Sequence, residues 1–148
     1  MAGTATAIDV PISHDPFRIL VIDDDPGLRG LLTVLFHREG WEVTTAADGQ
    51  MAVQQMTLTR PHVVVLDLML PKLTGLEVLE QITAQDPTCG QRVLIVTAIS
   101  EAQLRKLPTD LGVWQVIRKP FDNIELLRSV HACATRLAHA PGQAKAVH

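Results

Sequence analysis

Three continuous apolar runs of strand length, each ending abruptly at a polar residue, constrain the fold of this chain most. They are Arg18–Ile22 before Asp23, His62–Leu66 before Asp67, and Arg92–Val96 before Thr97. Their apolar residues leave no polar face, which is typical of strands in a parallel sheet covered by helices on both sides. Two weaker segments, 41–46 and 114–118, also have the composition of strands. The sequence therefore predicts five strands.

Helical signals separate these strands. Asp25 and Pro26 suit the cap and the first turn of a helix, and Gly40 suits its end. The apolar face of this helix is predicted to consist of Leu28, Leu31, Leu32 and Leu35. Further helices are expected after Asp48, after the Leu-Pro pair at 70 and 71, and after Ser100 and Asp122, and Pro108 should shorten or distort the fourth one. Strands that alternate with helices predict an α/β fold with a doubly wound parallel sheet.

The length of 148 residues fits one domain, expected over residues 17–138, with flexible tails at 1–16 and 139–148. Apolar residues make up 47% of the chain and aromatic residues only 3%, so the core must consist of Val, Leu and Ile. With a net charge of -3 the chain lacks the excess of positive charge that favours binding to nucleic acid or to an anionic membrane. We therefore expect no direct nucleic-acid binding.

No apolar run approaches the roughly 18 residues that a membrane-spanning helix needs. Residues 1–15 lack the basic start and apolar core of a signal peptide. No membrane insertion and a cytoplasmic location are therefore expected. Cys89 and Cys133 lie far apart in the sequence and form no CxxC unit, which favours two reduced thiols.

Polar side chains stand at the carboxyl ends of four predicted strands. They are Asp23, Asp24, Asp67, Thr97 and Lys119. In an open parallel sheet the ligand site lies beyond those ends. Two carboxylates about 5 Å apart repel by roughly 3 kcal/mol at an effective dielectric constant of about 20. A group of three would therefore either take up protons or recruit a cation. Ligands that are all oxygen favour Mg²⁺, which commonly binds a phosphate oxygen as well. The site therefore implies a phosphate.

A nucleophilic role for Asp67 assigns roles to the other residues. An acyl phosphate on its side chain presents three oxygens that need partners. The metal, held largely by Asp23 and Asp24, would bind one, Lys119 a second and the Thr97 hydroxyl a third. No general base is needed, because a carboxylate is already ionised at neutral pH. These residues indicate a phosphoacceptor.

With these residues in place, the chain resembles the receiver domain of two-component response regulators from about Arg18 to Ala138. Five blocks carry the resemblance in the family's order: Ile-Leu-Val-Ile-Asp-Asp-Asp-Pro at 19–26, Val-Val-Leu-Asp-Leu-Met-Leu-Pro at 64–71, Gly75, Val-Thr-Ala at 96–98, and Lys-Pro-Phe at 119–121. The blocks are specific as a set, whereas any one alone is weak. The resemblance implies a flavodoxin-like fold with strand order 2-1-3-4-5.

By this resemblance Asp67 is the phosphoacceptor, Asp23 and Asp24 are the acidic pair, and the Met69 backbone carbonyl is a further Mg²⁺ ligand. Thr97 is the switch hydroxyl and Lys119 the phosphate-binding lysine. The family takes its phosphoryl group from a histidine kinase or histidine phosphotransfer protein. The phosphorylated form then binds a downstream protein through the face of the fourth helix, fifth strand and fifth helix. The resemblance is also compatible with a homodimer. The chain would be a signalling domain rather than an enzyme, although it would catalyse its own Mg²⁺-dependent phosphorylation.

The sequence departs from the family pattern at several positions. Val116 stands where the family usually has Tyr or Phe, and Pro108 falls in the helix that normally moves. Thr74 replaces the common Asp before the glycine. Met69 and Ile99 are apolar at positions that influence water access to the phosphoryl group in this family. We therefore predict slow self-dephosphorylation.

Three functions remain to be compared. Only about ten residues follow the last predicted helix, which favours a stand-alone receiver over a truncated transcription factor. A degenerate receiver that binds a protein without phosphorylation is favoured by Val116 and Pro108, whereas the intact acidic set argues against it. A Mg²⁺-dependent phosphatase with an aspartyl nucleophile usually has a second Asp where this chain has Met69. Trp114 is either a core residue or part of an exposed apolar patch that binds a partner.

Overall fold

The computed structural model describes residues 16–108 and 111–138 of the chain. Within these ranges five strands form one parallel sheet in the order β2-β1-β3-β4-β5. This order confirms the predicted α/β, flavodoxin-like fold. The tails expected at 1–16 and 139–148 lie, apart from Pro16, outside the described residues. The boundaries expected for the domain stay a prediction.

The strands follow the predicted segments closely. Their bounds are β1 Arg18–Ile22, β2 Glu42–Ala46, β3 Val63–Leu66, β4 Val93–Thr97 and β5 Gln115–Arg118. β1 spans the predicted residues, and each of the other four begins one residue later than expected. Thr97 is the last residue of β4 rather than the residue after it.

Five helices of the described part connect or follow these strands. They are α2 Pro26–His37, α3 Gly49–Thr59, α4 Gly75–Gln85, α5 Glu101–Arg105 and α6 Asn123–Ala138. A 3-10 turn, η1, covers Cys89–Arg92 before β4. Among the described residues no helix has both the length and the apolar character that a membrane span needs.

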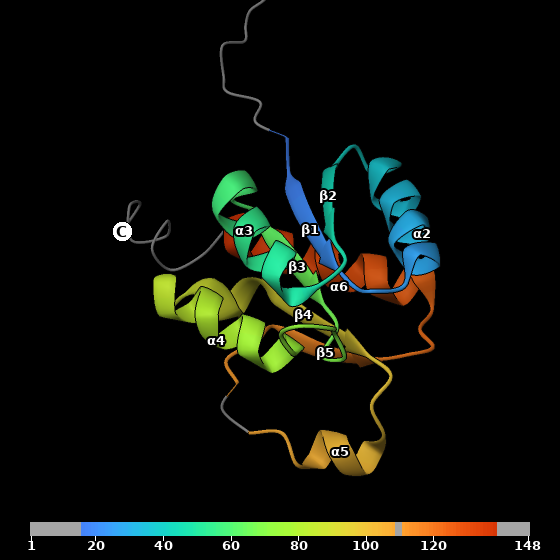
Figure 1. Cartoon of the computed structure of the whole chain (residues 1–148). Coiled ribbons are helices and arrows are strands. Elements are labelled where there is room, and N and C mark those ends of the chain that lie inside the picture. The colour runs from blue at the N-terminus through green and yellow to red at the C-terminus, as the bar shows by residue number, and fades with distance from the viewer. Residues whose placement is uncertain (1–15, 109–110, 139–148) are drawn as a thin grey trace, which may run out of the picture.

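The helices cover both faces of the sheet, with α3 and α4 on one side and α2 and α6 on the other (Figure 1). Because side chains alternate along a strand, β1 contributes to both layers of the core. Leu20 and Ile22 join the buried cluster under α3 and α4, and Ile19 and Val21 join the one under α2 and α6. All four are fully buried, as expected for a central strand.

Side-chain caps begin several of the helices. Asp25 accepts a hydrogen bond from the Gly27 N–H at the start of α2, which confirms its role as a helix cap. Thr74 caps α4 in a capping box with Glu77, so the residue before Gly75 has a structural role here. Such caps satisfy backbone N–H groups that have no partner within the helix.

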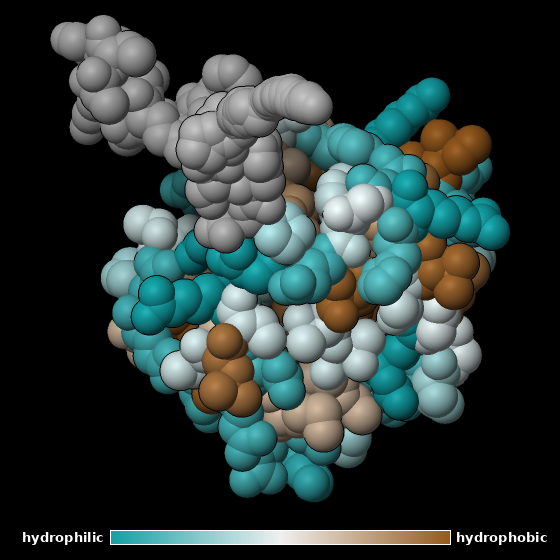
Figure 2. Space-filling view, turned by 90° about the horizontal axis from the view of Figure 1, so that it is seen from above, coloured by the Kyte–Doolittle hydropathy of each residue, from teal (hydrophilic) through white to brown (hydrophobic). Residues whose placement is uncertain are grey.

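The predicted apolar face of α2 is wrong at one position. Leu31 is 46% exposed, and Phe36 is fully buried in its place. The buried side of α2 is formed by Leu32 and Phe36, with Leu28 and Leu35 partly buried beside them. Figure 2 shows one side of the molecule as mainly hydrophilic, with separate hydrophobic patches rather than one apolar face.

The fourth helix of the fold, α5, is short and exposed. It has five residues, and none of them is buried. Ser100 and Gln103 form the predicted capping box at its start, and Pro108 lies three residues beyond its end at Arg105. The predicted shortening is confirmed, since proline cannot donate the backbone hydrogen bond that a longer helix would require. In Figure 1 α5 lies below β5, apart from the other helices.

Trp114 combines a core position with a polar contact. It is partly buried against the cluster under α2 and α6. Its indole Nε1 donates to the Ser129 carbonyl at 3.2 Å, and the guanidinium carbon of Arg136 lies 4.6 Å from the ring centroid. Val116, in contrast, packs partly buried against the cluster on the other face. Trp114 is therefore better described as a partly buried core residue than as part of an exposed apolar patch.

Candidate functional site

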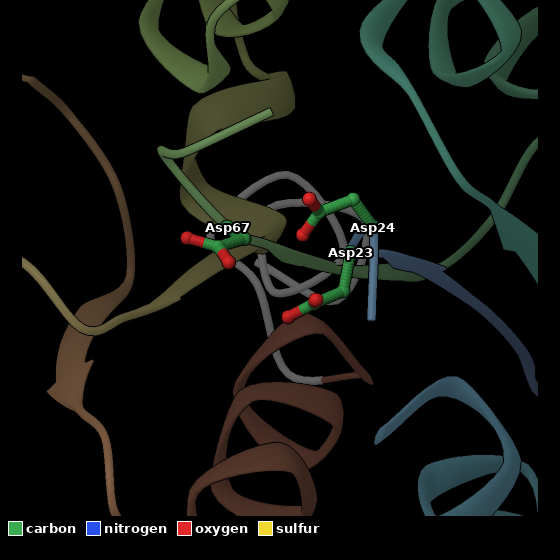
Figure 3. Close-up of side chains that lie close together, drawn as sticks. All are labelled: Asp23, Asp24 and Asp67. Carbon is green, nitrogen blue, oxygen red and sulfur yellow. The ribbon is translucent and has the colours of Figure 1, made fainter. Parts of the chain in front are cut away.

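The carboxyl ends of β1 and β3 bring three carboxylates together. Asp23 and Asp24 directly follow β1, and Asp67 directly follows β3. Each offers an oxygen, and these atoms all lie within 4.8 Å of one another. Figure 3 shows the three side chains converging on a common space from neighbouring strand ends. Asp23 and Asp67 are buried, at 4% and 5% exposure, whereas Asp24 is exposed.

Lys119, at the end of β5, binds two of these carboxylates. Its Nζ lies 2.6 Å from Asp23 Oδ2 and 2.9 Å from Asp67 Oδ2. Burial lowers the pKa of the Lys119 ammonium, but the hydrogen bonds to Asp23 and Asp67 outweigh burial and raise the pKa above its ordinary value. The ammonium therefore stays charged at neutral pH.

One ammonium does not compensate this group of acids fully. The pKa of Asp23 is raised, chiefly because burial penalises the carboxylate and also because Asp67 is close, although Lys119 and the Asp25 N–H act in the opposite direction. Among the described residues, Lys119 provides the one ammonium that pairs with this group of three acids, and it contacts two of them. An additional cation would remove the remaining repulsion, and an all-oxygen donor set suits a hard divalent ion.

Backbone N–H groups fix the orientation of the two buried carboxylates. The Asp25 N–H donates to Asp23 Oδ1 at 2.9 Å, and the Met69 N–H donates to Asp67 Oδ1 at 3.0 Å. Each bond spans two residues, as in an Asx turn. Oδ2 of both residues is left for Lys119. Met69 itself is 57% exposed beside the site.

Thr97 has an unusual environment for a hydroxyl group. Its side chain is 0% exposed, and its Oγ1 has no hydrogen-bond partner among the described residues. A buried polar atom without a partner costs about 1–3 kcal/mol. Since Thr97 ends β4 and its carbonyl accepts from the Lys119 N–H at 2.8 Å, this hydroxyl is tied to the same edge of the sheet. It is suited to a ligand oxygen.

Gly75 allows α4 to begin against the backbone of Asp67. A Cβ atom at this position would lie 2.3 Å from the Asp67 carbonyl oxygen and 2.5 Å from the Leu68 Cα. Contacts this short with backbone atoms do not occur in folded proteins, so only glycine fits here. The sequence pattern contained Gly75 but did not reveal what it touches.

Sequence reasoning missed one residue of the site, Arg29. Its guanidinium donates to the Asp23 backbone carbonyl at 2.8 Å. A bond from a side chain to a backbone carbonyl has no signature in residue spacing, so the sequence alone held no signal for it. The structure brings the five predicted side chains to the carboxyl edge of the sheet.

The family model of the response regulator receiver domain matches residues 19–131 of the chain. The chain belongs to this family. Members are phosphoacceptor switches of two-component systems that interact with histidine kinases or phosphotransfer proteins, and the acidic cluster of this receiver fits the phosphorylation site.

Individual relatives agree with this assignment. The chain is similar to the transcriptional regulatory protein TrcR of Mycobacterium tuberculosis, at 35% identity over 127 residues that cover 84% of this chain and 48% of the relative. It is also 35% identical over 113 residues to the sporulation initiation phosphotransferase F of Bacillus subtilis, covering 76% and 90% of the two chains. The receiver thus spans about half the length of TrcR and most of the phosphotransferase.

Solved structures include similar receivers. The response regulator TrrA of Thermotoga maritima, in complex with Mg²⁺-BeF, is 30% identical with a TM-score of 0.69. The match covers 78% of this chain and 97% of TrrA.

Proposed function

We propose that Asp67 of this receiver accepts a phosphoryl group from a histidine kinase or histidine phosphotransfer protein. Mg²⁺ is the proposed ion, held by Asp23, Asp24 and Asp67 together with the Met69 backbone carbonyl. The observation that carries the proposal is the convergence of three carboxylates and the Lys119 ammonium at one edge of the sheet. When bound, Mg²⁺ supplies positive charge to the transferring phosphoryl oxygens.

The transfer requires few protein groups. A carboxylate oxygen of Asp67 forms a bond to phosphorus while the bond from phosphorus to the donor's histidine nitrogen breaks, and that nitrogen retains the electron pair. No proton has to leave Asp67, because its carboxylate is the nucleophile. Lys119 Nζ, already 2.9 Å from Asp67 Oδ2, is placed to stabilise the negative charge of the phosphoryl group.

The Thr97 hydroxyl provides the proposed link from chemistry to signal. It has no partner among the described residues, so a phosphoryl oxygen that accepts its hydrogen bond removes the cost of the buried polar atom. This hydrogen bond forms only in the phosphorylated state, and its free energy biases the receiver toward the conformation in which the Thr97 hydroxyl reaches the phosphoryl group on Asp67. Phosphorylation thereby selects one of two states.

The output of the switch is proposed to be a protein contact through the face of α5, β5 and α6. The short α5, with no buried residue, is the element of this face that a small shift at Thr97 can displace most easily. A homodimer, a receiver domain over residues 17–138 and a cytoplasmic location are further proposals from the sequence. We further propose that small-molecule phosphoryl donors phosphorylate the receiver and that its self-dephosphorylation is slow.

Beryllofluoride, a stable analogue of the aspartyl phosphoryl group, tests this proposal. Adding it with Mg²⁺ to ¹⁵N-labelled receiver should shift the backbone resonances of Asp67, Thr97 and α5, and Asp67→Asn should abolish the shifts. The proposal fails if the wild type shows no response, or if Asp67→Asn responds equally. Asp122→Asn, which changes the same charge at an exposed carboxylate, is the matched control and should respond like the wild type.

The second candidate is a degenerate receiver that binds its partner without phosphorylation. It is favoured by the five-residue α5 and by Val116, which lacks the aromatic ring expected at that position. Once a partner is isolated, equal affinity for unphosphorylated wild type, phosphorylated wild type and Asp67→Asn would establish this function. A phosphorylation-dependent affinity that the variant lacks would exclude it.

A further inference from the structure

Arg29 is tied to the acidic site through the backbone. Its side chain projects from the first turns of α2, and its NH1 donates to the Asp23 carbonyl at 2.8 Å. Asp23 lies one residue beyond the end of β1, where its own N–H still pairs with the Ala46 carbonyl. A charge-assisted bond from Arg29 to this carbonyl therefore joins the end of β1 to α2.

The orientation of Asp24 depends on this short segment. The neighbouring Asp23 and Asp67 carboxylates are fixed by backbone N–H groups and by Lys119. Asp24, in contrast, is exposed, and the direction of its carboxylate toward Asp67 in Figure 3 follows from the backbone that carries it. That backbone is held on one side by the Arg29 bond and on the other by the Asp25 cap of α2.

We infer that Arg29 is a positioning residue for the divalent cation, acting through the 23–25 backbone rather than by touching the ion. The inference deepens the proposed function, because it rests on the same metal site. Preorganised ligands bind a metal more tightly, and loss of a group that orients them typically weakens affinity by roughly 10- to 100-fold. Because the bond goes to a backbone carbonyl, its effect should appear in metal affinity without any change in the ligand set.

Metal affinity can be measured without phosphorylation. Free Mn²⁺, followed by its electron paramagnetic resonance signal, reports ion binding directly, and competition by Mg²⁺ gives the Mg²⁺ affinity. We expect Arg29→Gln to weaken both affinities by roughly 10-fold. Arg29→Lys, which keeps a charged donor, should recover part of this loss. Arg38→Gln, the same change of charge at the opposite end of α2, should bind like the wild type.

Thermal unfolding separates positioning from general damage. A merely structural role for Arg29 would lower the unfolding temperature but leave the dissociation constants of the folded variant unchanged. Affinities of Arg29→Gln within twofold of the wild type would therefore overturn the inference, as would an equal loss in Arg38→Gln. If the wild type binds neither ion, the metal site of the proposed function fails, and the inference fails with it. If the wild type binds the ions and Arg29→Gln binds them equally well, only the inference about Arg29 is overturned, and the metal site of the proposed function stands.

Discussion

The Lys119 ammonium donates to Asp67 Oδ2 at 2.9 Å, across 52 residues of sequence. The same ammonium lies 2.6 Å from Asp23, so the residue that follows β5 contacts the residues that follow β1 and β3, although β4 lies between β3 and β5 in the sheet. In the absence of metal, this ammonium is the main positive charge opposing the repulsion among the acids. It is also the group that a bound phosphoryl oxygen would draw away from the carboxylates.

Removal of this ammonium should make the stability of the receiver more dependent on metal. Without Mg²⁺, Lys119→Met should lose roughly 3 kcal/mol of unfolding free energy, because two buried carboxylates lose their partner. Added Mg²⁺ should then raise its melting temperature more than that of the wild type, since binding to the native state alone stabilises it. Urea denaturation and thermal melts with and without Mg²⁺ measure both effects. Lys106→Met, at an exposed lysine, is the control, and an equal Mg²⁺ response in all three proteins would contradict the prediction.

Two glycine substitutions should have opposite effects. Gly75→Ala should cost at least about 2 kcal/mol, because its Cβ would meet the Asp67 and Leu68 backbone at 2.3 and 2.5 Å. Gly30→Ala, in the middle of α2 with nothing within 4 Å of the new Cβ, should stabilise the chain by roughly 0.5–1 kcal/mol. Chemical denaturation of both variants measures the difference. Equal effects would mean that α4 does not begin against the Asp67 backbone.

The ion pair between Asp86 and Arg92 should stabilise the fold at neutral pH but not in strong acid. Hydrogen bonds from Thr88 and the charge of Arg92 hold the pKa of Asp86 below its ordinary value. A lowered pKa in the native state contributes stability above the unfolded value, and this contribution disappears as pH falls through the native value. Because Asp86 is 47% exposed, Asp86→Asn should cost less than about 1 kcal/mol at pH 7. Urea denaturation from pH 7 to about pH 3 should show the cost shrinking, and a cost that grows toward acid pH would refute the assignment.

The phosphorylated state should be long-lived because Met69 and Ile99, the residues expected to control water access to the phosphoryl group, are apolar. Met69 is exposed at the site and its N–H binds Asp67, whereas Ile99 is 8% exposed. Met69→Asn, which offers a water molecule a polar partner, should shorten the phosphorylated half-life several-fold. Loss of phosphate from purified phosphorylated protein gives the rate. Leu58→Asn, the same type of change at a side chain that is 75% exposed on α3, should leave the rate unchanged. A half-life that Met69→Asn does not shorten would refute this explanation.

Strand positions and the polar residues that end them could be predicted because both depend on local sequence. A continuous apolar run such as Val63–Leu66 is possible only between two layers of helices, and the residue after it must lie at the carboxyl edge. Asp67 and Lys119 therefore meet because of strand order, although 52 residues separate them. The family motifs supplied that order.

The remaining features depend on contacts that spacing does not encode. Helical periodicity located an apolar face on α2, but the packing of α2 against the sheet decides which residues of that face are covered. Leu31 is exposed and Phe36 is buried. The Arg29 bond and the unpartnered Thr97 hydroxyl are properties of tertiary packing, and only coordinates reveal them.

Phosphorylation of Asp67 is tested most directly by intact-protein mass spectrometry after incubation with acetyl phosphate. Wild type and Asp67→Asn are compared, each with Mg²⁺ and with a chelator. We expect the wild type to gain the mass of one phosphoryl group only when Mg²⁺ is present, and Asp67→Asn to gain none. An adduct on Asp67→Asn, or no adduct on the wild type with Mg²⁺, would contradict the proposed phosphoacceptor site.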